Sequence, residues 1–273
     1  MAEASAADPR FQQLAYVSGA PGPHLRAIPV ECNETRSTNR EKKMARRTFL
    51  KASAFTTASL LAWPASSIRA NADGKKVLHF GYNAEVLTLD PIKTVYGPDI
   101  IIQGMMFARL LQANADRTKV GPGLAESWEI SDDGKTYTFH LTDAKFSDGS
   151  PITAEDVAFS YTRMRTQKDS AYAAPFQPLV KAEAKDPKTV VMTLDRRFTP
   201  FLTLCEIWNT GIVPKAAVTK MGDDAFAKAP IVSGPFKFVE WKTGDRVILA
   251  KNEHYYRQGL PHLDGLEFMY IPD

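Results

Sequence analysis

The chain has 273 residues, of which 44% are hydrophobic and 24% charged, and this is the composition of an ordinary globular protein. Its net charge of +3 is unevenly spread: residues 1–72 hold ten Lys/Arg and five Asp/Glu (10 − 5 = +5), so residues 73–273 carry 24 − 26 = −2. A slightly acidic body has no electrostatic attraction to phosphate backbones, so nucleic acid is excluded as an expected partner.

Residues 44–72 have the pattern of an export signal. Paired arginines precede a weakly apolar run that closes on Ala-x-Ala, and this order predicts a cleaved signal peptide. The run is too short and too rich in Ser and Thr to span a bilayer, and its start resembles the twin-arginine type. The residues that carry the signal are Arg46, Arg47, Phe49, Leu50 and Lys51 at its start and Ala70 and Ala72 at the cleavage site.

Residues 1–43 lack periodicity and contain several Gly, Pro and polar residues. Because signal peptides begin near the N-terminus, we expect translation to start at Met44 and residues 1–43 to be a non-native or disordered extension. Cys32 lies in the leader and Cys205 in the body, so the body cannot form an internal disulfide. Cys205 stands in an apolar run, which favours a buried thiol over a reactive one.

The body alternates strand and helix patterns. Residues 76–82 predict a strand, and residues 98–111 predict a buried helix with Pro98 in its first turn. Residues 126–141 predict a hairpin that turns at Asp133-Gly134. A helix follows from a partial capping box made by Thr153 and Asp156. Two further hairpins are expected at 179–195 and 236–252, so the fold class is α+β rather than a strict strand–helix alternation.

Motifs for common enzyme classes are missing from the sequence. It contains no G-x-G-x-x-G, Walker loop, H-E-x-x-H or G-x-S-x-G, and its five histidines lack zinc-ligand spacing. Its carboxylate pairs lie in predicted turns or helix starts, where they favour local N–H groups. We therefore expect no cofactor, no metal and no catalysis. The strand-like run that reaches residue 273 has nothing after it to close the core, which we interpret as a fragment.

Three long segments resemble the family 5 extracellular solute-binding proteins of ABC importers. They read GLAESWEISDDGKTYTFHL, KFSDGSPITAEDVAFSY and VSGPFKFVEWKTGDRVILAKNEHYY, and TLDP and VPKAAV extend the match collinearly over residues 76–273. The resemblance implies a periplasmic-binding-protein-like class II fold of two lobes, with residues 73–273 forming mainly the first lobe and its accessory subdomain. Thr142 stands where the family usually has Arg, and VSGPF is a variant of its Gly-rich segment.

The resemblance also implies a function. The protein is expected to capture di- or oligopeptides in the periplasm and to deliver them to an inner-membrane permease whose ATPase is a separate protein. The same fold binding a nickel chelate, an opine or a sugar remains an alternative, and a periplasmic hydrolase is the alternative from another class.

Four candidate contact regions follow from the resemblance. The segment after the LDP motif supplies Gly97, Asp99 and Ile100, although Asp99 has an alternative role as a helix-start charge. Residues 206–211 supply a large aromatic, which is otherwise a core residue, and two hydrogen-bonding side chains. In that segment the three candidates are Trp208, Asn209 and Thr210. The Gly-rich segment supplies Ser233 and Gly234, and the end of the first strand supplies Tyr82 and Asn83.

Overall fold

A computed structural model describes residues 74–114, 116 and 118–272. The chain divides into Met1–Ser66 and Ser67–Asp273, and all described residues lie in the second unit. The predicted export signal and the 1–43 extension therefore lie outside the described residues. The described helices are α1 (Gly97–Met106), α2 (Ala154–Thr166), α3 (Phe201–Leu204), α4 (Lys215–Met221) and α5 (Asp223–Phe226).

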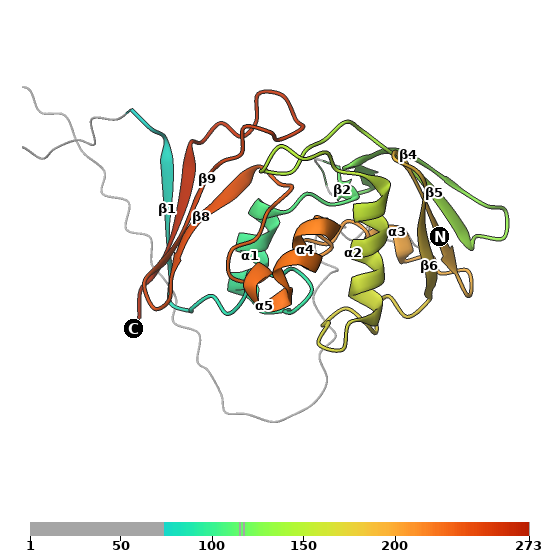
Figure 1. Cartoon of the computed structure of the whole chain (residues 1–273), viewed down its shortest axis with the longest axis horizontal. Coiled ribbons are helices and arrows are strands. Elements are labelled where there is room, and N and C mark those ends of the chain that lie inside the picture. Colours follow the sequence, from blue (N-terminus) through green and yellow to red (C-terminus); the bar gives the residue numbers. More distant parts are fainter. Residues whose placement is uncertain (1–73, 115, 117, 273) are drawn as a thin grey trace, which may run out of the picture. The chain divides into compact units, whose positions relative to one another are not determined.

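One four-stranded sheet joins the two ends of the described chain (Figure 1). Its order is β1-β10-β9-β8, formed by β1 (Val77–Tyr82), β10 (Gly265–Tyr270), β9 (Arg246–Lys251) and β8 (Phe236–Lys242). The central and outer pairs β10·β9 and β9·β8 are antiparallel, and β8 and β9 form the predicted hairpin around Gly244, whose φ is +72°. The pair β1·β10 is parallel, so the predicted strand at 76–82 is confirmed but its partner lies almost 190 residues away.

A second four-stranded sheet has the order β4-β5-β7-β6 and is antiparallel throughout. It is formed by β4 (Ala125–Ile130), β5 (Thr136–Leu141), β7 (Thr189–Leu194) and β6 (Leu179–Asp186), so both predicted hairpins are confirmed. Helix α2 covers this sheet, and the Thr153 N–H at its start donates to the Asp156 carboxylate at 2.9 Å, as the predicted capping box requires. A short ribbon of β2 (Leu111–Ala113) and β3 (Val120–Pro122) lies beside it.

Helix α1 ends five residues earlier than the sequence predicts. The apolar pattern extends to residue 111, but the helix stops at Met106 because the Gly234 N–H donates to the Met106 carbonyl at 2.7 Å. The Ala108 N–H likewise donates to the Ser233 hydroxyl at 2.9 Å. A crossing segment thus takes the carbonyl and the N–H that the next helical turn needs. The prediction of a helix buried nearly all round was also wrong, since Ile100 and Ile101 are only half-buried.

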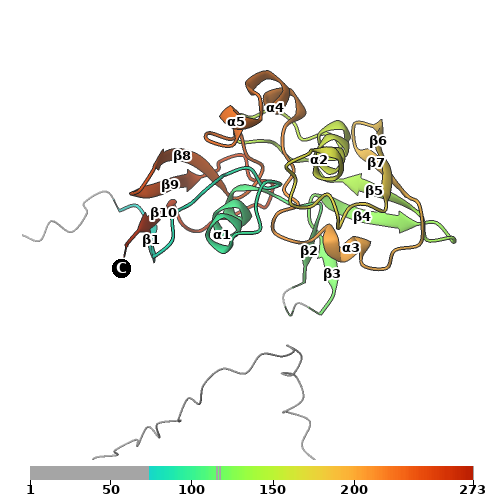
Figure 2. The same ribbon diagram turned by 90° about the horizontal axis from the view of Figure 1, so that it is seen from below.

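The two sheets bury separate cores. Phe139, Tyr161 and Phe176 lie in the core beneath the second sheet, and Ile102, Phe107 and other side chains fill the core of the first. Figures 1 and 2 both show α1 against the first sheet and α2 against the second. Amphipathic helices stabilise each sheet by removing its apolar face from water.

A buried ion cluster connects the segment after β1 to the helices. The Arg163 guanidinium donates to both oxygens of Asp90, at 2.8 and 2.5 Å, and to Asp223 at 2.6 Å. Arg163 lies on α2 and Asp223 begins α5, so one side chain ties the LDP motif to both helices.

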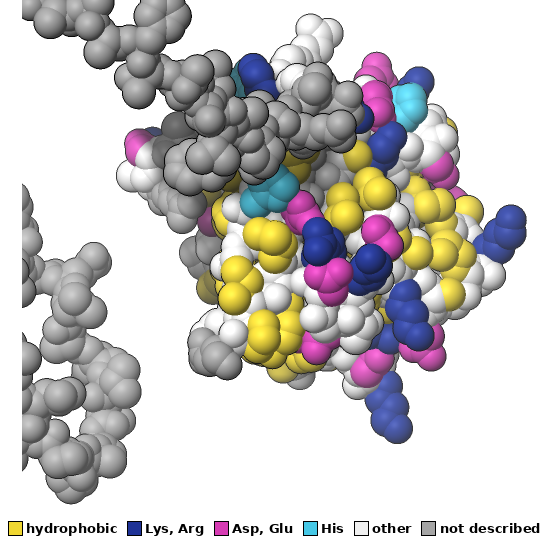
Figure 3. Space-filling model, turned by 90° about the vertical axis from the view of Figure 1, so that its left-hand side faces the viewer, with side chains coloured by type: hydrophobic (Ala, Val, Ile, Leu, Met, Phe, Trp, Pro, Cys, Tyr) yellow, Lys and Arg dark blue, Asp and Glu magenta, His cyan; other side chains and the backbone are white. Residues whose placement is uncertain are grey.

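Apolar and charged side chains share the outer surface of the first sheet. Figure 3 looks onto the side of the molecule that carries this sheet and shows yellow apolar groups among acidic and basic ones. On β8 Val239 is 52% exposed, and on β1 His79 contacts Glu267 of β10 at 2.7 Å. Among the described residues, no helix is both long and apolar enough to cross a membrane.

Candidate functional site

Two pockets contain residues that the sequence predicts as ligand contacts. The narrow pocket is lined by Tyr82, Ala84, Glu85, Val86, Pro98, Ile102, Trp241, Lys242, Gly244, Asp245, Arg246, Val247, Phe268, Met269 and Tyr270. The open pocket is lined by Ile100, Arg109, Gln112, Ala113, Asn114, Tyr172, Glu206, Ile207, Trp208 and Asn209. Including the space open to solvent, their free volumes are about 360 and 1120 Å³, so the open pocket has more room for a peptide-sized ligand.

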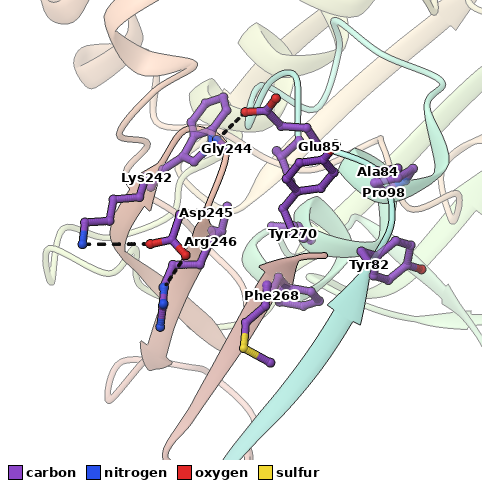
Figure 4. A pocket seen from close by; sticks show the side chains of 15 residues that line it. Tyr82, Ala84, Glu85, Pro98, Lys242, Gly244, Asp245, Arg246, Phe268 and Tyr270 are labelled. Carbon is purple, nitrogen blue, oxygen red and sulfur yellow. Dashed lines mark hydrogen bonds and ion pairs between the residues drawn. The ribbon is translucent and has the colours of Figure 1, made fainter. Parts of the chain in front are cut away.

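The charged side chains of the narrow pocket are already paired. Figure 4 shows Glu85 reaching the turn between β8 and β9, where it accepts the Gly244 N–H at 2.6 Å. In the same turn Asp245 contacts Lys242 at 4.0 Å and Arg246 at 3.0 Å. These contacts leave mainly apolar surface for a ligand, so the narrow pocket offers little polar recognition.

Asn209 fastens the wall of the open pocket. It is 3% exposed, and its Nδ2 donates to Gln103 Oε1 at 3.0 Å and to the Thr94 carbonyl at 3.3 Å. Gln103 in turn donates to the carbonyls of Thr88, at 3.0 Å, and Asp90, at 3.2 Å. Because these amides are satisfied internally, they hold residues 88–94, α1 and the turn at 207–210 together.

The indole of Trp208 lies on α1 above Gly104. A Cβ added at Gly104 would stand 2.8 Å from Trp208 Cε3 and 3.1 Å from its Cδ2, so the ring rests directly on the helix backbone. Trp208 is nevertheless 36% exposed. It is therefore not a core residue, which was the alternative interpretation, and one part of the ring is available in the open pocket.

Three polar side chains give the open pocket its chemistry. Arg109 is half-buried, and burial lowers the pKa of its guanidinium. Glu206 lines the same pocket and has a buried carboxylate oxygen, Oε2, without a hydrogen-bond partner. Burial raises the pKa of Tyr172 to about 12, so its phenol stays neutral at physiological pH. The pocket thus combines an aromatic surface with one basic and one acidic group.

The structure brings only some of the predicted residues to these pockets. Ile100, Trp208 and Asn209 meet in the open pocket, and Tyr82 lines the narrow one. Asn83 is exposed at the end of β1. Their roles as ligand contacts remain predictions.

Gly97 and Asp99, which stand beside Ile100 in sequence, are placed differently. Gly97 is exposed at the start of α1, and a Cβ there would meet nothing within 4 Å. Asp99 is fully buried and accepts the Leu87 N–H at 2.8 Å, and burial raises the pKa of its carboxyl. Asp99 therefore fixes the chain segment before α1 rather than facing solvent.

Thr210, Ser233 and Gly234 make internal contacts. The Thr210 hydroxyl donates to the Ile207 carbonyl at 2.8 Å, and the Ser233 hydroxyl donates to the Ile212 carbonyl at 2.8 Å; both residues are fully buried. A Cβ at Gly234 would lie 2.6 Å from the Met106 carbonyl carbon, so only glycine allows the crossing that ends α1.

Sequence reasoning missed Arg109 and Tyr172, and it proposed the segment 206–211 without singling out its first residue, Glu206. Their segments are far apart along the chain, and no spacing rule connects them. The one usable signal is the charge of Arg109 within the apolar run MFARLL, since a cation in such a run needs a specific environment. Within residues 74–114, 116 and 118–272, no group of three metal-ligating side chains is found.

Comparison with known proteins identifies relatives in sequence. The family model described as bacterial extracellular solute-binding proteins, family 5 Middle, matches residues 119–273. The probable D,D-dipeptide-binding periplasmic protein DdpA of Escherichia coli is 37% identical over 190 residues, which are 66% of this chain and 37% of DdpA. The periplasmic oligopeptide-binding protein OppA of the same organism is 30% identical over 217 residues, 72% of this chain and 40% of OppA.

Solved structures give the same relationship. The periplasmic binding protein AgaA from A. tumefacien R10, in complex with agropinic acid, superposes with a TM-score of 0.67 at 34% identity. The match covers 71% of this chain and 39% of AgaA. The described fold is therefore part of a class II periplasmic-binding-protein architecture, as the sequence predicts.

The chain spans about two-fifths of the length of the relatives it matches. The family model nevertheless covers more than half of this chain, at residues 119–273. The chain thus belongs to the bacterial extracellular solute-binding proteins of family 5.

Proposed function

We propose that this chain is the ligand-capturing part of an ABC importer, which binds di- or oligopeptides in the periplasm and delivers them to an inner-membrane permease. Family membership carries the proposal, because the matched relatives are named as binding proteins rather than as enzymes. The ATPase that drives import is a separate protein in this scheme.

The open pocket supports binding of a small polar ligand. Its aromatic surface covers an apolar part of a ligand, while Arg109 and Glu206 provide groups of opposite charge. The carbonyls and amides around Asn209 are satisfied internally, so the wall is rigid before a ligand arrives. A rigid wall of this kind suits capture of ligands without chemical turnover.

Peptides are the favoured ligand class because DdpA and OppA are named for dipeptides and oligopeptides. The agropinic acid complex of AgaA keeps an opine as the second candidate. Predicted contacts at Tyr82, Ile100 and Trp208 suit either ligand, so they do not separate the two.

Calorimetry on the purified exported protein tests the proposal. A mixed library of di- to pentapeptides is titrated first, and agropinic acid, a nickel chelate and a sugar set are titrated in parallel. We expect heat from the peptide library and unchanged peptides by mass spectrometry afterwards. Binding only of another class would transfer the proposal to that class, and cleaved peptides would favour a hydrolase.

Export through the twin-arginine machinery is a second part of the proposal and is supported by Arg46, Arg47 and the Ala-x-Ala exit at Ala72. Replacing both arginines by lysine keeps the charge and is expected to retain the precursor in the cytoplasm. Mature protein beginning at Asp73 in the periplasm of the unmodified strain is the matching positive result. Normal export of the double variant would contradict this route.

A further inference from the structure

The Arg109 guanidinium lines the open pocket without a partner from the described part of the chain. No hydrogen bond or ion pair within 4.0 Å holds it there, and its Nε atom is buried and unsatisfied. Even a half-buried cation carries a desolvation cost unless some group pairs with it. A ligand in the pocket can supply the partner that the described residues do not provide.

The backbone holds Arg109 in one place. Its carbonyl accepts the Leu124 N–H at 2.9 Å, and Arg109 forms a β-bridge with Gly211. The preceding residue, Ala108, is fixed by its hydrogen bond to Ser233. Contacts with three other segments therefore fix the backbone at Arg109. A fixed backbone favours one defined contact of the side chain with a ligand over the many positions of a mobile surface arginine.

The surroundings keep Arg109 charged and accessible to an anion. Glu206 lies close enough to attract it but makes no ion pair with it, and Arg257 nearby opposes the positive charge. Tyr255 stays neutral because burial raises its pKa to about 12. Although burial lowers the pKa of Arg109, a guanidinium does not lose its proton in a protein.

We propose that Arg109 anchors a carboxylate of the ligand in the open pocket, while Trp208 covers the adjoining part of that ligand. A guanidinium binds a carboxylate through two parallel N–H···O bonds, and a lysine in its place keeps the charge but loses the fork. This inference rests on the proposed function, since it names the chemical group of the ligand, a carboxylate, that contacts the open pocket.

The test compares two matched libraries on the exported protein: di- to pentapeptides with a free C-terminal carboxylate and the same peptides with a C-terminal amide. We expect wild type to prefer the free acids by about 10- to 100-fold, the range for hydrogen bonds to a charged group. Arg109→Gln is expected to remove most of that preference while amide binding stays unchanged. Arg109→Lys is expected to lie between the two.

Arg196→Gln is the control, because Arg196 is exposed and pairs with the adjacent Asp195 at 3.0 Å. It should bind like wild type. An undiminished acid preference in Arg109→Gln would overturn the role of Arg109 and leave the proposed function standing, and Arg109→Lys decides the question if the glutamine variant fails to fold. Equal affinity of wild type for acids and amides also refutes the anchor. If wild type binds neither library, the proposed function and the inference fall together.

Discussion

Arg163→Met tests how strongly one buried cation holds the fold together. The Arg163 side chain is 4% exposed, and that of Asp90 is fully buried. The guanidinium is the only cation that contacts Asp90 among the described residues, through two hydrogen bonds of 2.8 and 2.5 Å. Burial opposes ionisation of Asp223, but hydrogen bonds from Arg163 and Gln167 lower its pKa overall. Methionine keeps much of the arginine's length while removing its charge.

The expected loss is about 3–5 kcal/mol of unfolding free energy, because the carboxylate of Asp90 is left buried without a counter-charge. That is a large part of the roughly 5–15 kcal/mol that stabilises a typical domain. Asp223 contributes less to the loss, since its side chain is 37% exposed and water replaces its partner. Asp90 also accepts the Ile92 N–H, so the segment beneath the open pocket should loosen with the cluster.

Urea unfolding followed by circular dichroism measures this loss on the mature protein. Arg196→Met is the matched control, because its exposed pair with Asp195 is worth less than about 1 kcal/mol. The double variant Arg163→Met/Asp90→Asn should recover part of the stability, since it removes the buried charge as well. An Arg163→Met protein within about 1 kcal/mol of wild type would refute the reasoning.

Three further outcomes are expected. Gly104→Ala should push the Trp208 indole aside and weaken ligand binding at least severalfold. It should change the free energy of unfolding by less than about 1 kcal/mol, because the better helix propensity of alanine and the crowding by its methyl group act in opposite directions. Gly97→Ala, in the same helix but facing open space, should bind ligand normally in the same titration. Cys205, whose pKa burial raises to about 12, should resist alkylation at pH 8 and react in urea, and mapping by mass spectrometry would expose the error if it reacts in the native state. Asp223, with its lowered pKa, contributes stability that is present above about pH 4 and is lost as the pH falls below that value. Asp223→Asn should therefore reduce the pH dependence of the free energy of unfolding below about pH 4. An unchanged pH dependence in this variant would contradict the role of Asp223.

Much of the local structure could be predicted from the sequence. The Asp133-Gly134 turn predicts its hairpin because Gly134 adopts φ +70°, which few other residues tolerate. Thr153 and Asp156 predict the start of α2 because their hydrogen bond spans only three residues. The family was also identified from collinear segments of the same kind. These features depend on neighbours along the chain, so a linear pattern contains them.

The open pocket, by contrast, depends on residues that are distant from one another along the chain. Ile100, Trp208 and Asn209 were proposed from the sequence, whereas Arg109, Tyr172 and Glu206 join them only in the folded protein. The helical pattern that runs through residue 111 was likewise interrupted by Gly234, more than 120 residues away.

The sequence by itself determined where strands, turns and helix starts lie, because hydrogen bonds and backbone preferences within a few residues decide them. Only the tertiary structure decided where α1 ends, that β1 pairs with β10, and which side chains share a pocket. Each of those results depends on contacts between segments separated by tens to hundreds of residues, and such contacts exist only once packing has brought the segments together.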